Sequence, residues 1–286
     1  MAHGITGIDH TLVGVRDLEA AQLHWTRLGF SLTPRGRHFG WGTANYCIMF
    51  GDSYVELLGI VEPDQPNNGL DVFLARRQGL MGVAWASRDC AATLASLRAA
   101  GLECDPARDL SRQLELPEDT VLLRFKLGYL PAAMTPGLTG FVCQHLTPDT
   151  LRRPEWLNHP NGAIGLKGIT IAVADAPALT PAYDALFGGH NVNRTDNVLT
   201  VHAGRQVLVF ATPDDLSALQ PDLDEADIPP TPAIVLMTLA SADLEQTADY
   251  LTQWQIEFQE HGQHSIVVPP ALATGVALEF VAVGQA

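Results

Sequence analysis

Apolar runs that alternate with helix-like stretches recur four times along this chain of 286 residues. The four runs begin at Ile8, Met81, Leu166 and Ala233, and each ends in a small residue followed closely by an aspartate. These aspartates are Asp17, Asp89, Asp175 and Asp243. An aspartate at this position can accept hydrogen bonds from the free N–H groups of a helix's first turn. The pattern therefore predicts four strands, each leading into an N-capped helix.

Three further β-rich runs follow each predicted helix. In the first unit they are FSLTPRG, TANYCIMF and SYVELLGI, and in the second they are LECDPA, TVLLRFKLG and TGFVCQHL. The four βαβββ units are expected over residues 4–60, 79–147, 166–212 and 233–283. One such unit cannot bury the face of its sheet alone, so the units must pair. The sequence thus predicts an α+β fold in which four units form two paired-sheet domains.

The boundary between the two domains is expected in the run PDTLRRPEWLNHPNGAIG, which is rich in Pro, Asn and Gly. This boundary gives a first domain over residues 1–150 and a second over residues 163–286. Residues 219–232 form an acidic, proline-rich run that we interpret as an exposed linker between the third and fourth units.

Composition limits the class of protein. Hydrophobic residues make up 47% of the chain and charged residues 17%, which is typical of a globular protein. The 32 acidic residues outnumber the 17 basic ones, so the surface repels a polyphosphate and nucleic-acid binding is not expected. The sequence has no bilayer-spanning run and no visible secretion signal. The four cysteines are interpreted as buried thiols of a cytoplasmic protein, with two disulfides as the alternative.

Two segments resemble a known family. These are RHFGWGTANYCIMFGDSYVELLGI at residues 37–60 and CQHLTPDTLRRPEWLNHPNGAIG at residues 143–165. They resemble the glyoxalase-like domain branch of the vicinal oxygen chelate superfamily. That superfamily includes glyoxalase I, extradiol dioxygenases, fosfomycin-resistance proteins and bleomycin-resistance binding proteins. From residue 166 onward the resemblance rests on the repeated pattern alone. It implies that paired sheets curve around a cup.

The resemblance implies metal ligands on the first and last strands of each paired unit. His10 occupies this position on the opening strand of the first unit, and Glu56 occupies it on the closing strand. An imidazole and a carboxylate suit Zn²⁺, Mn²⁺, Fe²⁺ or Ni²⁺. The alternative for His10 is a core histidine that is hydrogen-bonded through both ring nitrogens. For Glu56 it is a buried carboxylate, which is costly unless charges or hydrogen bonds compensate it.

The third ligand comes from the second unit. Its opening strand carries Gly82 where the first unit has His10, and its closing strand carries Gln144 and His145 together. Strand alternation allows only one of the pair to face the cup. His145 would complete a set of two histidines and one carboxylate. The alternative is Gln144 as the third ligand, which would give a weaker, more oxygen-rich site, with His145 facing outward and bracing the boundary segment.

Other polar residues are candidates for catalysis and substrate binding. Thr43 and Asn45 lie at alternate positions of an otherwise apolar strand, where they could orient substrate or pair with neighbouring backbone. His38 is expected in a Gly-rich loop, as an acid or base near neutral pH or as a solvated side chain. Arg124 could bind a substrate carboxylate through two hydrogen bonds, or could pair with an internal acid such as Glu56.

The second half offers fewer candidates. Gly168 stands where the first unit has His10, and Glu279 has no visible partner ligand. Extradiol dioxygenases of four units hold iron in their second pair, so ring cleavage is disfavoured here. The second half is expected to shape the site, to form a homodimer or to be a vestigial duplicate.

Two functions remain from the sequence. The first is a metal-dependent enzyme that acts on a small carbonyl, hydroxy or epoxide substrate with vicinal oxygens. It would carry out lyase or isomerase chemistry, with Glu56 or His38 as the base. The second is a metal-free protein that sequesters a small molecule, as bleomycin-resistance proteins do. The partner in either case is a small molecule, and neither nucleic acid nor a membrane is expected.

Overall fold

The computed structural model describes residues 2–116, 119–221, 223–262 and 264–283. Within them the order β-α-β-β-β occurs four times. The strands are β1 Ile5–Gly14, β2 Gly36–His38, β3 Thr43–Met49, β4 Tyr54–Ile60, β5 Gly79–Ser87, β6 Arg108–Glu115, β7 Thr120–Tyr129, β8 Thr139–His145, β9 Ala163–Ala172, β10 Val192–Thr195, β11 Val198–Ala203, β12 Gln206–Ala211, β13 Ala233–Ser241, β14 Gln259–His261, β15 Ser265–Val268 and β16 Ala277–Ala282. The α-helices are α1 Leu18–Arg27, α2 Leu70–Arg76, α3 Cys90–Ala99, α4 Pro148–Leu151, α5 Thr180–Phe187, α6 Pro213–Leu219 and α7 Leu244–Gln253.

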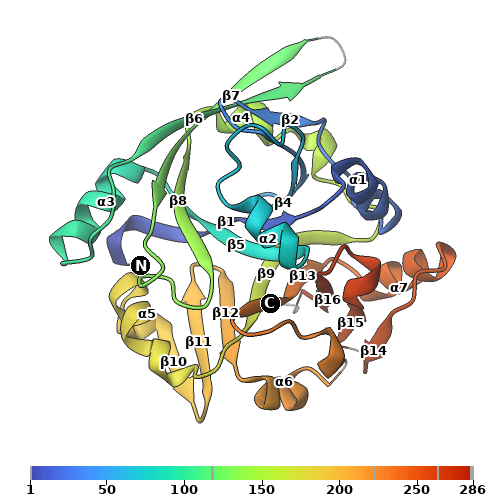
Figure 1. Ribbon diagram of the computed structural model, residues 1–286. Helices are drawn as coiled ribbons and strands as arrows, with labels where there is room; N and C mark the ends of the chain where they lie inside the picture. Colours follow the sequence, from blue (N-terminus) through green and yellow to red (C-terminus); the bar gives the residue numbers. More distant parts are fainter. Residues whose placement is uncertain (1, 117–118, 222, 263, 284–286) are drawn as a thin grey trace.

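The first eight strands close into a barrel in the order β1-β4-β3-β2-β6-β7-β8-β5. Within it, β1 runs parallel to β4 and antiparallel to β5, while β5 runs parallel to β8. The last eight strands form an eight-stranded sheet in the order β10-β11-β12-β9-β13-β16-β15-β14. Figure 1 shows the barrel above and the second sheet below, with α1, α3, α5, α6 and α7 around the outside. The α+β fold of paired units is therefore as the sequence predicts.

Two predicted strands lie elsewhere. The runs FSLTPRG and LECDPA were expected to be strands, but β2 begins only at Gly36 and β6 only at Arg108. Pro34 and Pro106 lie inside these runs, and a proline has no N–H to donate to a strand pair. Each strand therefore starts after its proline.

The predicted helix caps are confirmed. Asp17, Asp89 and Asp243 are the N-caps of α1, α3 and α7, and each side chain accepts a backbone N–H from the first turn. Asp175 accepts from the Ala178 N–H at 3.1 Å. A short 3₁₀ turn, Pro177–Leu179, follows Asp175, so α5 begins only afterwards.

A continuous hydrophobic core joins the two halves. It contains outward-facing barrel residues such as Ile8 and Val13 and second-half residues such as Ile171 and Phe210. Polar contacts also cross the junction. Trp25 Nε1 donates to Thr274 Oγ1 at 2.9 Å, and Ile8 N donates to Gln206 Oε1 at 3.2 Å. A separate, smaller cluster fills the interior of the barrel.

The boundary segment is anchored to the first half. The Ser31 N–H donates to His159 Nδ1 at 3.0 Å, and His159 Nε2 lies 3.0 Å from the Met49 carbonyl oxygen. Asn161 Nδ2 donates to the Leu28 carbonyl at 2.9 Å. These contacts satisfy buried backbone groups, so His159 has a structural role in the turn.

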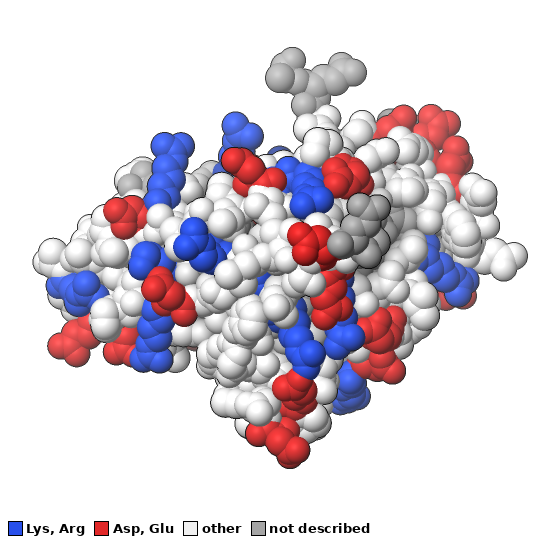
Figure 2. Space-filling model, turned by 90° about the horizontal axis from the view of Figure 1, so that it is seen from above, with Lys and Arg blue, Asp and Glu red and all other residues white. Residues whose placement is uncertain are grey.

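Surface and composition agree with a globular chain. Figure 2 shows acidic and basic side chains interspersed on the face seen from above. The residues Asp224–Asp227 of the predicted linker are exposed, although Leu223 is buried beside them. All four cysteines are free thiols. Among the helices that the structure describes, none combines the length and apolarity needed to span a bilayer.

Candidate functional site

The barrel encloses a cavity of about 100 Å³. Alternate positions of the strands point into it, because successive side chains of a strand face opposite sides of a sheet. Tyr54, Glu56 and Leu58 of β4 all line the cavity. Its aromatic wall consists of Trp41, Tyr54, Phe125, Tyr129 and Phe141, and its ionisable lining of His10, His38, Glu56, Arg112 and Cys143.

A bulge in β1 brings two neighbouring ionisable side chains together. Ile8 pairs with Trp85 and His10 pairs with Ala84, so Asp9 is an extra residue in the ladder. In a regular strand Asp9 and His10 would face opposite sides, whereas a bulge re-aims a side chain. Both are buried, and the Asp9 carboxylate lies against the His10 ring. Asp9 was not among the predicted site residues.

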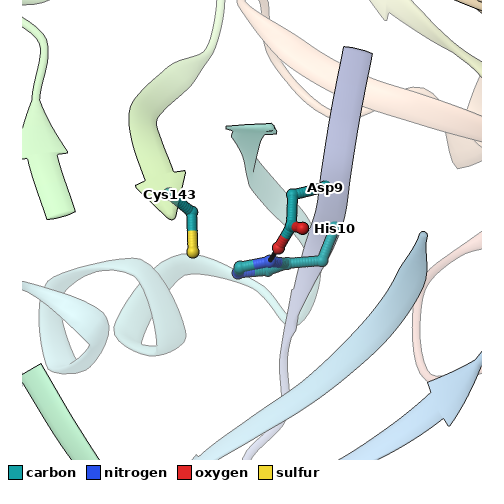
Figure 3. Close-up of side chains that lie close together, drawn as sticks. All are labelled: Asp9, His10 and Cys143. Atoms are coloured by element: carbon teal, nitrogen blue, oxygen red, sulfur yellow. Dashed lines mark hydrogen bonds and ion pairs between the residues drawn. The ribbon is translucent and has the colours of Figure 1, made fainter. Parts of the chain in front are cut away.

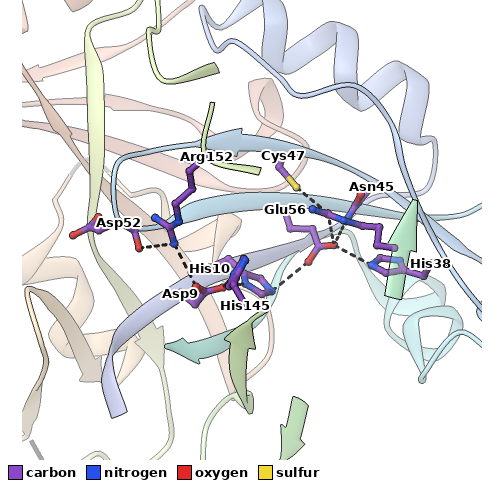
Figure 4. Close-up of polar contacts among 10 residues, drawn as sticks. Asp9, His10, His38, Asn45, Cys47, Asp52, Glu56, His145 and Arg152 are labelled. Carbon is purple, nitrogen blue, oxygen red and sulfur yellow. Dashed lines mark hydrogen bonds and ion pairs between the residues drawn. The ribbon is translucent and has the colours of Figure 1, made fainter. Parts of the chain in front are cut away.

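The His10 ring is held from three sides. Its Nδ1 lies 2.7 Å from Asp9 Oδ2, and its Nε2 lies 3.4 Å from Glu56 Oε2. The ring stacks on Tyr54, with centroids 4.3 Å apart. Asp9 thus fixes the orientation of the ring and holds a proton at Nδ1, which directs Nε2 toward Glu56 (Figure 4). The structure therefore brings together the two principal predicted ligands.

The two oxygens of Glu56 have different surroundings. Oε1 accepts a hydrogen bond from Asn45 Nδ2, and it lies 3.7 Å from His38 Nε2 and 4.0 Å from Arg112 Nη1. Oε2 faces His10. Burial alone would raise the pKa of Glu56, but His10, His38, Arg112 and Asn45 outweigh it and hold the pKa below its usual value. Glu56 is therefore ionised at neutral pH.

His38 lies in the cavity rather than in a solvated loop. It ends β2, and its Nδ1 lies 3.0 Å from Thr43 Oγ1, so two predicted site residues are in contact. Burial lowers the pKa of His38 to about 4, and the nearby Arg112 adds to this effect while Glu56 opposes it. The expectation that His38 titrates near neutral pH is therefore corrected: the imidazole is neutral there.

The paired residues Gln144 and His145 separate as strand alternation requires. Gln144 Oε1 points to the outside of the barrel, where it accepts the Cys90 N–H at 3.0 Å. His145 Nε2 lies 2.9 Å from Asp9 Oδ2, and its ring packs edge-on against Phe125. His145 thus reaches His10 through Asp9, whereas Glu56 contacts the opposite ring nitrogen of His10.

Asp9 is the centre of this second contact group. Besides the two histidines, Arg152 Nη2 lies 3.6 Å from Asp9 Oδ1. Burial alone would raise the pKa of Asp9, but the interactions with His145 and His10 outweigh it and hold the pKa well below its usual value. Asp9 therefore remains a buried anion that orients the two histidines.

Arg112 takes the place expected for Arg124. Arg124 is exposed on β7, on the face opposite the cavity-lining Phe125. Arg112 lies on β6, is 2% exposed and lines the cavity. The sequence prediction of Arg124 as a substrate-binding residue is therefore corrected. Arg112 was missed because its strand was expected several residues earlier.

Three potential metal ligands lie close enough together to hold one cation. Among the described residues, ligand atoms of Asp9, His10 and Cys143 lie within 4.8 Å of one another (Figure 3). Burial raises the pKa of the Cys143 thiol well above its usual value, and Asp9 and Glu56 add to this effect. A thiolate is hard to form here, so the pair of His10 and Glu56 suits a cation better. His10 belongs to both arrangements.

The second half has no comparable group in the part that the structure describes. Glu279 on β16 accepts a hydrogen bond from Thr238 Oγ1 of β13 at 2.8 Å. β13 runs parallel to β16 as β1 does to β4, with Thr238 opposite Glu279 where the first half has Leu12 opposite Glu56. By the same register Leu236 stands where the barrel has His10, so this sheet has an apolar side chain in place of the imidazole.

Residues 8–187, more than half of the chain, match the family described as the glyoxalase-like domain. The chain therefore belongs to the glyoxalase-like domain family. The resemblance predicted from the first half is thus confirmed. Among curated proteins, no sequence matches the chain significantly.

Several solved structures share this fold. A hypothetical protein from Staphylococcus aureus has a TM-score of 0.68 at 11% identity, covering 96% of this chain and 99% of its own. A mutant of 4-hydroxymandelate synthase from Streptomyces coelicolor has a TM-score of 0.62 at 12% identity, covering 99% and 94%. A fusion protein of a xylose isomerase-like TIM barrel and 4-hydroxyphenylpyruvate dioxygenase has a TM-score of 0.54 at 13% identity, and the match covers 100% of this chain and 50% of the fusion protein. At these identities the likeness establishes the fold alone.

Proposed function

We propose that this protein is a metal-dependent enzyme of the glyoxalase-like type that acts on a small substrate with vicinal oxygens. The observation that carries the proposal is the distance of 3.4 Å between His10 Nε2 and Glu56 Oε2, both buried in the barrel. Two atoms this far apart can bind one cation at ligand distances of roughly 2.0–2.2 Å. The remaining positions would be open to substrate.

The donor set fits a divalent transition metal. His10 and Glu56 would hold the ion, and Asp9 would orient the imidazole through Nδ1. Asn45 donates to Oε1 of Glu56, which leaves Oε2 directed at His10. When bound, such a cation supplies a Lewis acid that polarises a substrate oxygen. His145 contacts Asp9. It would either help Asp9 to orient His10 or bind the cation as the third ligand.

Lyase or isomerase chemistry is the finer part of the proposal, because it requires a proton to be moved within the cavity. His38 is neutral at physiological pH, so one of its ring nitrogens can accept a proton transiently. Glu56 faces His10 and would be held as a ligand of the cation, so its role is to bind, which leaves His38 as the candidate base.

The test is the metal content of protein purified without chelators. We expect close to one equivalent of a transition metal in the wild type and its loss in His10→Ala and Glu56→Gln. The matched control is His24→Ala, since His24 is exposed on α1 and lies outside the barrel. Wild-type protein that is metal-free, and that binds no added Zn²⁺, Mn²⁺, Fe²⁺ or Ni²⁺, would contradict the proposal.

A metal-free binding protein is the second candidate. One observation favours it: Asn45 and Arg112 already compensate the buried charge of Glu56. The cavity would then sequester a small apolar or aromatic molecule between its rings. Binding of such a molecule that is unchanged by chelator and by His10→Ala would favour this function over the enzyme.

A further inference from the structure

Arg112 is a buried cation with unused donors. Its side chain is 2% exposed, and an arginine keeps its charge in a protein. Nη1 donates to Cys47 Sγ at 3.2 Å, while Nε and Nη2 are shielded from solvent and have no hydrogen-bond partner among the residues that the structure describes. Buried polar groups are almost always hydrogen-bonded, so an exception of this kind requires an explanation.

Glu56 balances this charge only at long range and accepts no hydrogen bond from it. The nearest carboxylate oxygen in an ion pair with Arg112 is Glu56 Oε1, at the long distance of 4.0 Å. That oxygen already accepts from Asn45 and lies near His38. The Cys47 thiol is a weak acceptor, and burial raises its pKa to about 11, so it carries no charge at neutral pH. Arg112 therefore lacks a dedicated anionic partner within hydrogen-bonding distance.

The unpaired donors belong to one edge of the guanidinium. Nε–H and one N–H of Nη2 lie side by side and parallel, which is the arrangement that matches the two oxygens of a carboxylate. Nη1, on the other edge, is the group that is occupied by Cys47. Arg112 also pairs across the β2–β6 ladder with His38, so both cavity residues are fixed by the barrel.

The cavity limits what can accompany the anionic group. An apolar cavity of about 150 Å³ holds benzene, and this one has only about 100 Å³, so the group that it holds is smaller than a benzene ring. The guanidinium lies over the Phe125 ring, with Cζ 5.6 Å from its centroid, and Tyr54 and Phe141 face the same space. The space therefore suits a short, flat, apolar group joined to an acid.

We propose that the barrel cavity binds a small monocarboxylate, with Arg112 as the partner of its carboxylate and the aromatic wall around its apolar part. This inference rests on the proposed function only in taking the cavity as the substrate site, and it does not require the cation. It adds the substrate class, a small carboxylic acid, to that proposal.

The experiment compares acids with their neutral amides on the full-length protein. Binding of propanoate and butanoate, and of propanamide and butanamide, is measured by calorimetry and by saturation-transfer NMR, with and without EDTA. We expect at least one of the acids to bind, about tenfold or more tightly than its amide. Arg112→Gln should remove this preference. The matched control Arg124→Gln, an exposed arginine on the neighbouring strand, should retain it.

The outcomes separate this inference from the proposed function. Failure of both acids to bind, or equal binding of acid and amide by the wild type, overturns the inference without needing a variant. Acid binding that requires added metal and survives Arg112→Gln also overturns it, because the cation is then the partner, and the proposed function stands. Acid binding that persists in EDTA, depends on Arg112 and occurs in protein with no metal affinity supports the inference and contradicts the proposed enzyme. If Arg112→Gln does not fold, the wild-type acid–amide comparison in EDTA decides.

Discussion

At the scale of single residues, the site depends on how burial and neighbouring charges fix protonation states. His38 shows this most directly, because burial lowers its pKa from 6.5 to about 4. The folded protein therefore favours the neutral imidazole, and the unfolded chain binds the extra proton between these two values. Stability linked to His38 is complete above pH 6.5 and is lost progressively as the pH falls toward 4.

This linkage gives a prediction for His38→Asn. Between about pH 7.5 and about pH 4.5 the wild type should lose about 2–3 kcal/mol more unfolding free energy than the variant does, because asparagine does not titrate. Urea denaturation at both pH values measures the difference. His24→Asn, on the exposed face of α1, is the control and should follow the wild type. An equal loss in wild type and His38→Asn would show that His38 is not held neutral by burial.

Some of these residues could be predicted from the sequence and others could not. His10 and Glu56 were found through the resemblance of their segments to a family, and alternation alone indicated that Glu56 shares a face with Tyr54. Asp9 and Arg112 could not be found in this way. Asp9 lies against His10 because of a local bulge, and the pairing of β2 with β6 places Arg112 opposite His38. Neither feature leaves a clear signal in a single sequence.

At the scale of elements, two irregularities of the strands build the site. Prolines delay β2 and β6, so these two strands meet near His38 and Arg112 and close the barrel. The bulge in β1 places Asp9 beside His10 and His145. Element types were predictable from apolar periodicity, whereas these offsets depend on pairing between strands that are distant in sequence.

Because the bulge places the Asp9 carboxylate against His10, the substitution Asp9→Asn should weaken metal binding. An amide can still contact His10, but it lacks the charge that fixes the proton at Nδ1 and balances Arg152. Metal affinity should fall by about 10–100-fold, as is typical when a carboxylate behind a ligating histidine is lost. Competition with a chelating dye measures this affinity. The control is Asp109→Asn, whose exposed carboxylate pairs with Lys126. Folded Asp9→Asn with wild-type affinity would contradict an orienting role for Asp9.

At the scale of the whole molecule, the two halves are joined by their cores. The outward face of the barrel, including Ile8 and Val13, packs with residues of the second sheet in one continuous cluster. Thr11 of β1 contacts Met237 of β13, with Oγ1 3.5 Å from Sδ. The family match also runs past the predicted boundary, to residue 187. The division at residues 150 and 163 therefore separates two sheets. The hydrophobic core between these sheets contains residues of both halves.

This shared core predicts that the halves unfold together. Hydrogen exchange, followed by mass spectrometry at increasing urea concentrations, should show peptides of β8 and β11 losing protection at the same midpoint, because neither sheet keeps its core when the other unfolds. Met237→Ala removes a fully buried side chain at the junction and should lower the unfolding free energy by about 2–5 kcal/mol. Both midpoints should then move by the same amount, although the substitution lies in the second half. Leu122→Ala, at an exposed position of β7, is the control and should move neither. If Met237→Ala lowers only the β11 midpoint, the barrel is stable without its partner sheet, and the second half then contributes little to holding the cavity in shape.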